Sequence, residues 1–530
     1  MLWLKRLRLL ERICFLKKIT ITRSISAFLL AATIGTALCG CKKDSVVPTE
    51  TSLSSSETTV AVTTEKTAET SDTETTTPET SKTKALPDTD YVRLIGDVTP
   101  EMMTPDYWLK GADDNLQMSA EQINEFNAAN KGKIKASDGK TVLPHPDDYE
   151  ETLDGKILRM FLKDNTKSVP KDPSQYYLNG KQTTADYWQK LVALSNIDGV
   201  PDEINVRYAF TTKRMTVRLF PTEDRVFKGN SDKYFDELLF SECMPYMPVV
   251  ALHESTDGKY LYVVFDSFAA WVRKDSVAIC KDKEDWEARK HPDKNLVVTA
   301  REIRLGNDPY NPLTSNLVLP MGTSMELVPA EKAPKSINQR TTYGNYVVKV
   351  PTRGNDGFIK DAYVLIPVSD DVNAGYLPMT SANIVKQAFK LLGDRYGWGG
   401  DLQANDCTGI TREIYRCFGL LLTRTGQSNS KGVYRVDMSK MNEKQKLEEI
   451  SKLSPGSLIS MPGHMMIYLG TVDGKPYVIS ACGSMVEPAP GPTELLHPNS
   501  VIINSLYARH KKLNTWLDTS TTVVTLKPAE

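Results

Sequence analysis

Between residues 206 and 370, apolar residues recur at every second position in short runs separated by turn residues. This pattern constrains the fold more than any other. Period two is typical of strands that bury one face. Pro248–His253 and Lys259–Phe265 flank Asp257-Gly258, a dipeptide that favours a tight hairpin turn. Several short strands joined by tight turns predict small barrels rather than a doubly wound sheet. We expect two in tandem: residues 206–290 and residues 291–370.

Residues 88–205 show helical spacing and loops instead. Ser119, followed three positions later by Gln122, has the pattern of a capping box at a helix start. Thr184–Leu194 places apolar residues on one helical face. Nothing in this region suggests chemistry, so we interpret it as an N-terminal helical domain that braces its neighbours.

Length and composition limit the remaining possibilities. A chain of 530 residues is too long for one hydrophobic core and implies several domains. Its formal net charge is -1, with no basic block beyond the first residues, so nucleic-acid binding has no electrostatic support. Residues 42–87 are dominated by Thr, Ser and Glu and cannot bury enough apolar surface to order, which predicts a disordered linker.

Residues 1–41 have the features of an export signal. Many Lys and Arg precede the apolar stretch Ile25–Leu38, which is too short to span a bilayer comfortably. The ending Leu38-Cys39-Gly40-Cys41 resembles a lipobox, and this implies that Cys41 is the first mature residue and carries lipid. The expected product is a membrane-anchored lipoprotein that faces the periplasm or cell wall. An ordinary cleaved signal is the alternative.

The region after the barrels contains a cysteine at a helix start. The pattern of Asn405–Gly419 predicts a helix with Cys407 in its first turn. Unpaired N–H groups and the helix dipole favour a thiolate there. Taken alone, a buried structural cysteine is an equally good interpretation.

A histidine on a predicted strand supplies the second component of a thiol hydrolase. Gly456–Met461 and His464–Gly470 are expected strands joined by Pro462-Gly463, so His464 opens the second one. A thiolate and a proton shuttle are the two groups that such catalysis needs. A strand histidine alone is more often a core residue.

The other cysteines suggest neither a disulfide framework nor a metal site. In the predicted mature chain, beyond Cys41, these are scattered and show no CxxC or Cys/His spacing: Cys243, Cys280, Cys417 and Cys482. We therefore expect no metal and no cofactor.

Five motifs together resemble, in order and spacing, the NlpC family of papain-like cysteine peptidases. They are Tyr396-x-Trp-Gly-Gly, Asp406-Cys407-Thr408-Gly409, Phe418-Gly419-Leu420, Arg424-Thr425 and Gly463-His464-x-x-x-Tyr468-Leu469-Gly470. The barrels resemble bacterial SH3-like domains, and the layout is similar to a subgroup of the family that has a helical N-terminal region and two such domains. The resemblance implies an α+β fold with a papain-like catalytic domain at residues 371–512 and a C-terminal tail at residues 513–530.

The resemblance implies a peptidase that cuts peptidoglycan stem peptides, typically between D-glutamate and the L-diamino acid. Cys407 is the implied nucleophile and His464 the implied base. Ser480 falls where the family usually has a larger polar residue, often His, that orients the imidazole. A short neutral hydroxyl would support the imidazolium less well.

Substrate-binding residues are also implied by the resemblance. Tyr396, Asp406 and Thr408 match positions that bind the free amine of an N-terminal L-alanine, and Trp398 belongs to the same motif. A carboxylate facing an ammonium forms a charge-assisted bond. Asp406 is equally well placed to cap the helix, and the two roles are compatible.

Two other functions remain open at this point. Ser480 is compatible with a catalytically impaired peptidoglycan-binding protein on the same fold, and an amidase or acyltransferase would use the same Cys/His pair. In each case the expected partners are stem peptides or muropeptides and, through Cys41, a membrane. We expect a monomer.

Overall fold

The computed structural model describes residues 86–111, 114–230, 232–424 and 430–528. The predicted export signal, the lipidation site Cys41 and nearly all of the predicted linker at 42–87 lie outside these residues. In the described part of the chain, no helix is both long and apolar enough to cross a membrane.

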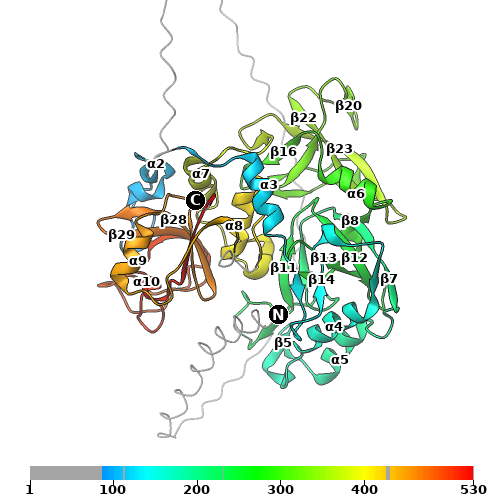
Figure 1. Cartoon of the computed structure of the whole chain (residues 1–530), viewed down its shortest axis with the longest axis horizontal. Helices are drawn as coiled ribbons and strands as arrows, with labels where there is room; N and C mark the ends of the chain where they lie inside the picture. Colours follow the sequence, from blue (N-terminus) through cyan, green and yellow to red (C-terminus); the bar gives the residue numbers. More distant parts are fainter. Residues whose placement is uncertain (1–85, 112–113, 231, 425–429, 529–530) are drawn as a thin grey trace, which may run out of the picture. The chain divides into compact units, whose positions relative to one another are not determined.

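The first barrel (residues 206–290) is built on a seven-stranded antiparallel sheet of order β11-β9-β14-β13-β12-β8-β15 (Figure 1). The predicted hairpin is confirmed, because β12 and β13 pair across a turn in which Gly258 has φ 69°. The strands are β8 (Arg207–Thr211), β9 (Met215–Arg218), β11 (Leu239–Cys243), β12 (Pro248–Glu254), β13 (Tyr260–Val264), β14 (Ala269–Arg273) and β15 (Val277–Ile279).

Helices that precede the sheet in sequence and a helix that follows it both pack on the sheet. Leu158 and Phe161 of α4 (Gly155–Thr166) share a core with Tyr262 and with Trp286 of α6 (Lys283–Lys290). Trp188 of α5 (Ala185–Leu194) packs with Phe220 and Leu238 in a smaller cluster. Shorter elements complete the region: β2 (Ile134–Lys135), β3 (Val142–Leu143), η2 (Pro146–Asp148), β4 (Thr152–Asp154), η3 (Pro173–Gln175), β5 (Tyr176–Leu178), β6 (Lys181–Gln182), β7 (Glu203–Asn205), β10 (Val226–Lys228) and η4 (Lys274–Ser276).

The second barrel, predicted for residues 291–370, contains a five-stranded antiparallel sheet of order β23-β22-β19-β16-β24, and its strand β24 lies just beyond the predicted boundary, in the range predicted for the catalytic domain. Its core includes Leu296, Val348 and Ile366. The elements are β16 (Asn295–Val298), β17 (Glu302–Arg304), η5 (Pro312–Thr314), β18 (Val318–Pro320), β19 (Ser324–Leu327), β20 (Ser336–Ile337), β21 (Arg340–Thr341), β22 (Asn345–Arg353), β23 (Ile359–Pro367) and β24 (Val372–Ala374).

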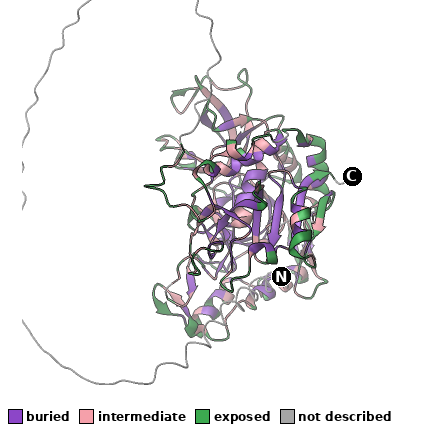
Figure 2. Ribbon diagram, turned by 90° about the vertical axis from the view of Figure 1, so that its left-hand side faces the viewer, coloured by how far each residue is buried: buried purple, intermediate pink, exposed green. Residues whose placement is uncertain are grey.

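The C-terminal region folds around a six-stranded antiparallel sheet of order β26-β31-β27-β28-β29-β30. The alternation of β28 divides two cores: Met465 and Ile467 face the cluster that contains α8, whereas Met466 and Tyr468 face the cluster that contains Trp516. Figure 2 shows the sheet strands of the molecule largely buried. The elements are β25 (Met379–Thr380), α7 (Ser381–Lys390), η6 (Trp398–Gln403), α8 (Cys407–Arg416), β26 (Val433–Asp437), α9 (Glu443–Ile450), β27 (Leu458–Met461), β28 (His464–Val472), β29 (Lys475–Cys482), β30 (Ser500–Ser505), α10 (Trp516–Thr519) and β31 (Thr522–Pro528).

The structure corrects the prediction of a C-terminal tail after residue 512. β31 lies inside the sheet and pairs with both β26 and β27. Val523 and Val524 are fully buried on opposite faces, one in each core. The place of β31 inside the sheet depends on pairing with strands far away in sequence, which no local pattern specifies.

The N-terminal region at 88–205 is likewise divided between two cores instead of forming one helical domain. Met102, Trp108 and Phe126 are buried in the C-terminal core with α8. The contributing elements are η1 (Pro100–Met103), α2 (Pro105–Trp108), β1 (Leu116–Met118), which pairs with β25, and α3 (Ala120–Ala129), which begins with the predicted capping box at Ser119. The rest of this region, from β2 to residue 205, instead packs on the first barrel.

Candidate active site

Cys407 is the first residue of α8, as the sequence predicted. Its thiol is half-buried and forms no disulfide. The N-cap is Asp406, whose side chain accepts a hydrogen bond from the Gly409 N–H. Apolar residues of α8, among them Ile410 and Ile414, lock the helix into the core that β28 and β29 also line. The helix start therefore holds the sulfur at a fixed point beside the sheet.

His464 opens β28 and is held by two contacts. Its Nε2 atom lies 3.0 Å from the Oγ atom of Ser480 on β29, which is fully buried. Its ring meets Trp516 edge-on, with centroids 5.1 Å apart. The pKa of His464 falls to about 4, chiefly because the ring is buried; the nearby His510 contributes to this lowering, whereas Asp406 opposes it. The imidazole is thus neutral near pH 7 and able to accept a proton.

The start of α8 lies at the end of the sheet where β28 begins. β28 and β29 are antiparallel, so the beginning of one strand lies beside the end of the other. The charge of Asp406 acts on His464, and that of Cys407 acts on Cys482, the last residue of β29. The structure therefore brings all three predicted catalytic residues to one region: Cys407, His464 and Ser480.

Asp406 is buried and fully engaged by the protein itself. Its Oδ1 atom accepts bonds from the Gly409 N–H at 2.8 Å and the Thr408 hydroxyl at 3.0 Å. Its Oδ2 atom accepts from the Gly399 N–H at 3.0 Å and from Arg424 at 2.5 Å. Burial raises the pKa of Asp406, but Arg424 and these hydrogen bonds outweigh burial and leave the pKa below its usual value. The carboxylate is therefore ionised and paired.

Aromatic rings line the same region. Phe235, an exposed residue of the first barrel, has its ring centroid 6.3 Å from that of Tyr396 and 5.8 Å from that of Trp398. The guanidinium of Arg424 lies 6.0 Å from the Trp398 ring centroid. The predicted substrate-binding residues Tyr396, Trp398, Asp406 and Thr408 thus lie together. Arg424 and Phe235 join them. The former was noted only as part of a motif, and no sequence signal identifies the latter.

The loop between Tyr396 and Cys407 is held against the first barrel. Gly399, Gly400 and Leu402 have positive φ values of 59°, 90° and 61°. Asp401 forms an ion pair with Arg225, and a Cβ atom at Gly400 would lie 2.3 Å from the side chain of Glu242. This close approach explains why the glycine-rich motif is needed here.

Beneath the helix start lies a buried charge cluster that sequence analysis missed. Arg214 forms a bidentate pair with Glu242, with both contacts at 2.7 Å, and lies 3.9 Å from Glu413 of α8. Asn405 donates to Glu413 at 2.8 Å. Burial raises the pKa of Glu413 to about 7. A charged residue within a helix is ordinarily expected on its solvent face, so nothing in the sequence pattern predicts that Glu413 is buried.

The remaining cysteines are unreactive by environment. Besides Cys407, the described part of the chain has four cysteines, all of them buried; burial raises the pKa of Cys280, Cys417 and Cys482 to about 12 and that of Cys243 still further. A thiol in such surroundings stays protonated and is a poor nucleophile. In the described part of the chain, no three His, Cys, Asp or Glu side chains are grouped to hold a metal ion.

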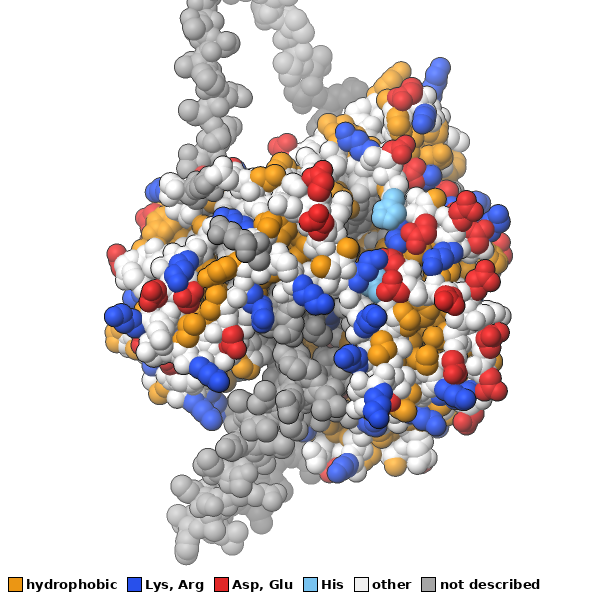
Figure 3. Space-filling model, in the orientation of Figure 1, with side chains coloured by type: hydrophobic (Ala, Val, Ile, Leu, Met, Phe, Trp, Pro, Cys, Tyr) orange, Lys and Arg blue, Asp and Glu red, His pale blue; other side chains and the backbone are white. Residues whose placement is uncertain are grey.

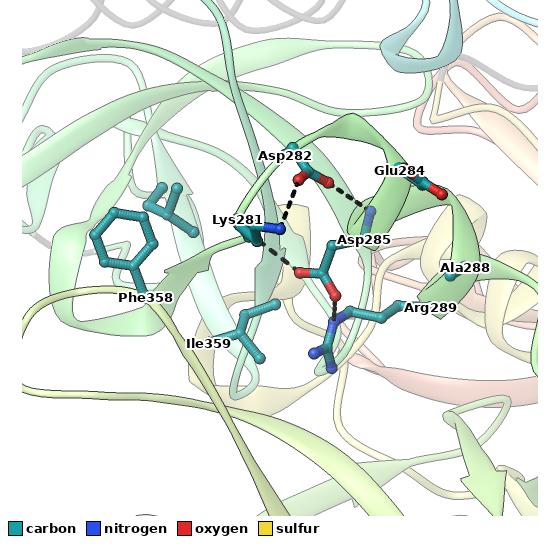
Figure 4. Close-up of a pocket in the computed structure, with 9 residues that line it drawn as sticks. Lys281, Asp282, Glu284, Asp285, Ala288, Arg289, Phe358 and Ile359 are labelled. Carbon is teal, nitrogen blue, oxygen red and sulfur yellow. Dashed lines mark hydrogen bonds and ion pairs between the residues drawn. The ribbon is translucent and has the colours of Figure 1, made fainter.

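A separate surface groove lies away from these residues, between α6 and the start of β23 (Figure 4). It encloses about 700 Å³. Figure 4 shows Phe358 and Ile359 on one side and the paired charges of Lys281, Asp282, Asp285 and Arg289 on the other. On the face drawn in Figure 3, acidic and basic side chains are interspersed, in keeping with the net charge of -1.

The C-terminal region has a papain-like fold of the NlpC/P60 kind, preceded by an SH3-like domain. Residues 393–517 match the model of the NlpC/P60 family, and residues 225–273 match the model of the SH3 domain of SH3b1 type. The chain thus carries an NlpC/P60 domain and an SH3b domain, which confirms the predicted resemblance for the catalytic domain and for one SH3-like domain, together with the α+β fold. No curated protein matches the chain.

Solved structures that are similar to this chain include the following two. One is described as a novel NlpC/P60 endopeptidase from Photobacterium damselae subsp. piscicida; it is 15% identical, with a TM-score of 0.62 over 83% of this chain and 99% of that one. The other is an NlpC/P60 family protein from Bacillus cereus ATCC 10987, 16% identical, with a TM-score of 0.40 over 61% of this chain and 100% of that one. The first shares the fold over most of the described residues.

Proposed function

We propose that this protein is a cell-wall hydrolase, a cysteine endopeptidase that cleaves peptidoglycan stem peptides at the γ-D-glutamyl-L-diamino acid bond, in substrates with a free N-terminal L-alanine. The observation that carries the proposal is the neutral imidazole of His464, bonded to Ser480 beside the helix that starts at Cys407. The NlpC/P60 domain supports the reaction class.

In this proposal Cys407 acts as the nucleophile. Its thiol proton passes to His464, and the sulfur attacks the scissile carbonyl carbon. Backbone N–H groups at the start of α8 stabilise the oxyanion. When the C–N bond breaks, His464 returns the proton to the leaving amine. Water, deprotonated by His464, then hydrolyses the thioester and regenerates the thiol. Ser480 positions the imidazole throughout.

The test is cleavage of L-Ala-γ-D-Glu-L-diamino acid peptides, followed by chromatography of the products. We expect the dipeptide L-Ala-D-Glu and a free diamino acid from the wild-type protein and no turnover from Cys407→Ala or His464→Ala. Equal activity of Cys407→Ala and wild type would exclude the mechanism.

An impaired wall-binding protein is the second candidate, because Ser480 is neutral where a larger partner is usual. Thiol labelling at neutral pH separates the two. An active peptidase labels rapidly at one position, and Cys407→Ala abolishes this labelling although the four buried cysteines remain. Labelling no faster than a model thiol would favour the impaired protein.

We also propose that lipid on Cys41 anchors the protein to a membrane and that the folded part faces the periplasm or cell wall. The basis is the lipobox-like ending of the N-terminal segment. In the native host, Cys41→Ser should move the protein from the membrane fraction to the soluble exported fraction. An unchanged distribution would exclude the anchor.

A further inference from the structure

The carboxylate predicted to bind the substrate amine has no open position. An ionised carboxylate offers about four acceptor sites. Those of Asp406 receive two backbone N–H groups, from Gly399 and Gly409, together with the Thr408 hydroxyl and the Arg424 guanidinium. The side chain is 3% exposed. A substrate ammonium can therefore reach Asp406 only if one of these donors leaves.

The four donors differ in how readily they can be replaced. The N–H of Gly409 belongs to the first turn of α8, and that of Gly399 to the loop held against the first barrel. Thr408 is neutral, so an ammonium in its place would leave two cations facing one carboxylate. Arg424 is the charged donor, and its side chain is 14% exposed against 3% for Asp406. Exchange of Arg424 for another cation keeps the buried charge compensated.

Arg424 already makes the contacts expected of the substrate amine. Its guanidinium donates to both Asp406 and Thr408 and lies 6.0 Å from the Trp398 ring centroid. Asp406 and Thr408 are two of the three residues predicted to bind the N-terminal amine, and Trp398 belongs to the same motif as the third, Tyr396. In the empty site, the guanidinium is an internal counterpart of the ammonium group.

We propose that Arg424 is a specificity-determining residue: it occupies the ammonium subsite in the empty enzyme, and a stem peptide with a free N-terminal amine binds by displacing the Arg424 guanidinium from Asp406. This inference rests on the proposed function. An N-acylated peptide has no cation to exchange and leaves Arg424 in place. Arg424 therefore lowers the affinity for free amines, because each binding event must first break the internal ion pair.

Kinetics on two matched substrates test the exchange. With L-Ala-γ-D-Glu-L-diamino acid, Arg424→Ala and Arg424→Gln should lower KM about tenfold, the worth of one charge-assisted hydrogen bond, with kcat within about twofold. KM for the N-acetylated peptide should not fall. Arg424→Lys, which retains a cation, should remain near wild type. Arg289 lies in the groove of Figure 4, and Arg289→Ala, which breaks its ion pairs with Asp285 and Asp361, is the control and should change neither KM.

A binding measurement guards against a variant that is merely unstable. Methylammonium should raise the Tm of Arg424→Ala but not of the wild type, because only the variant has an empty cation position. If Arg424→Ala instead lowers kcat on both substrates with KM unchanged and shows no response to methylammonium, Arg424 only supports the start of α8 and the exchange is wrong. If the wild type cleaves neither substrate, the proposed function fails. In that case, calorimetry of L-Ala-D-Glu binding to wild type and Arg424→Ala still decides the exchange: tighter binding to the variant supports it, and equal or weaker binding overturns it.

Discussion

The Nε2 atom of His464 lies 3.0 Å from the Oγ atom of Ser480, so a hydroxyl on the neighbouring strand fixes the orientation of the candidate base. His464 opens β28, and Ser480 lies near the end of β29. The antiparallel pairing of these strands brings the two residues together. Ser480 is fully buried, with 0% of its surface accessible to solvent. A water molecule cannot take over its role without a cavity.

Replacement of Ser480 by Ala should therefore lower kcat/KM by roughly five- to thirtyfold, the worth of about 1–2 kcal/mol for a lost hydrogen bond to a group that becomes charged in the reaction. KM should change little, because Ser480 lies behind the imidazole. Steady-state kinetics on the stem peptide measure the effect.

Ser457→Ala is the matched control for this change. The buried hydroxyl of Ser457, directly before β27, lies 3.2 Å from that of Thr525 on β31. Ser457→Ala should lower the free energy of unfolding by about as much as Ser480→Ala does and leave kcat unchanged. If both variants have the kcat of the wild type, Ser480 has no role in orienting the base.

The protonation of His464 gives a second prediction. Its pKa of about 4 lies below the value of about 6.5 for free imidazole. Between these values the unfolded chain binds more protons than the folded one, so His464 makes the protein less stable as pH falls through this window. The NMR titration midpoint of His464 should lie below 6.5. His510→Gln should raise it, because the charge of His510 opposes protonation of His464. The exposed His291→Gln should not, and an unshifted midpoint in His510→Gln would contradict this coupling.

Much of the catalytic region was predictable because its signals are local. The start of α8 follows from a capping aspartate and apolar residues at four-residue spacing, and β28 follows from alternation after a Pro-Gly turn. Each of these signals lies within a dozen residues of the element that it specifies. The pairing of Cys407 with His464 needed the family motifs as well.

The parts that escaped prediction depend on contacts between residues far apart in sequence. Trp108 packs against Tyr477, with ring centroids 5.4 Å apart, and no local pattern connects them. Arg424 pairs with Asp406, at the proposed amine subsite, and the motifs did not predict this ion pair. The partners of Glu413 come from the first barrel and from the loop before α8. Sequence periodicity specifies which face is buried but not what covers it.

Glu413 provides a third prediction, through the pH dependence of stability. Burial raises its pKa from 4.5 to about 7, so between these values the folded protein binds more protons than the unfolded chain. Glu413 therefore lowers stability as pH rises from about 4.5 to 7, by on the order of 1–3 kcal/mol. Glu413→Gln should remove this loss. The measurement is the difference in free energy of unfolding between pH 5 and pH 8, obtained with urea.

Glu326→Gln is the control for Glu413. Glu326 forms a partly exposed pair with Lys349 at 2.7 Å, and such pairs contribute about 0–1 kcal/mol. Its substitution should leave the difference between pH 5 and pH 8 unchanged. A Glu413→Gln protein with the wild-type difference would show that Glu413 is not the group responsible.

Gly400 gives a fourth prediction, on the rigidity of the loop before Cys407. Gly400→Ala places a Cβ atom 2.3 Å from Glu242, which Arg214 holds in place, at a φ of 90°. Gly375→Ala meets the same backbone restriction at φ 92° with nothing within 4 Å. The control should lose roughly 1–2 kcal/mol. Gly400→Ala should lose clearly more in urea unfolding and also lose most of its kcat/KM, and equal losses in the two variants would show that the contact with Glu242 is unimportant.

The contribution of the first barrel to the site gives a fifth prediction. Phe235 is 38% exposed, and its ring lies beside those of Tyr396 and Trp398. An exposed aromatic side chain adds little to folding but offers a flat apolar surface to a bound peptide. Phe235→Ala should therefore raise KM for the stem peptide about three- to tenfold, equivalent to about 0.7–1.4 kcal/mol, with kcat and the free energy of unfolding nearly unchanged.

Phe358 offers a matched control, because it is 50% exposed but lies in the groove of Figure 4, away from Cys407. Phe358→Ala should leave both kcat and KM at wild-type values. If the two alanine variants show the same KM, the first barrel does not contact the substrate, and its role is limited to holding the loop at Gly400. If only Phe235→Ala is affected, substrate recognition depends on two domains, and the first barrel is needed for activity as well as for folding.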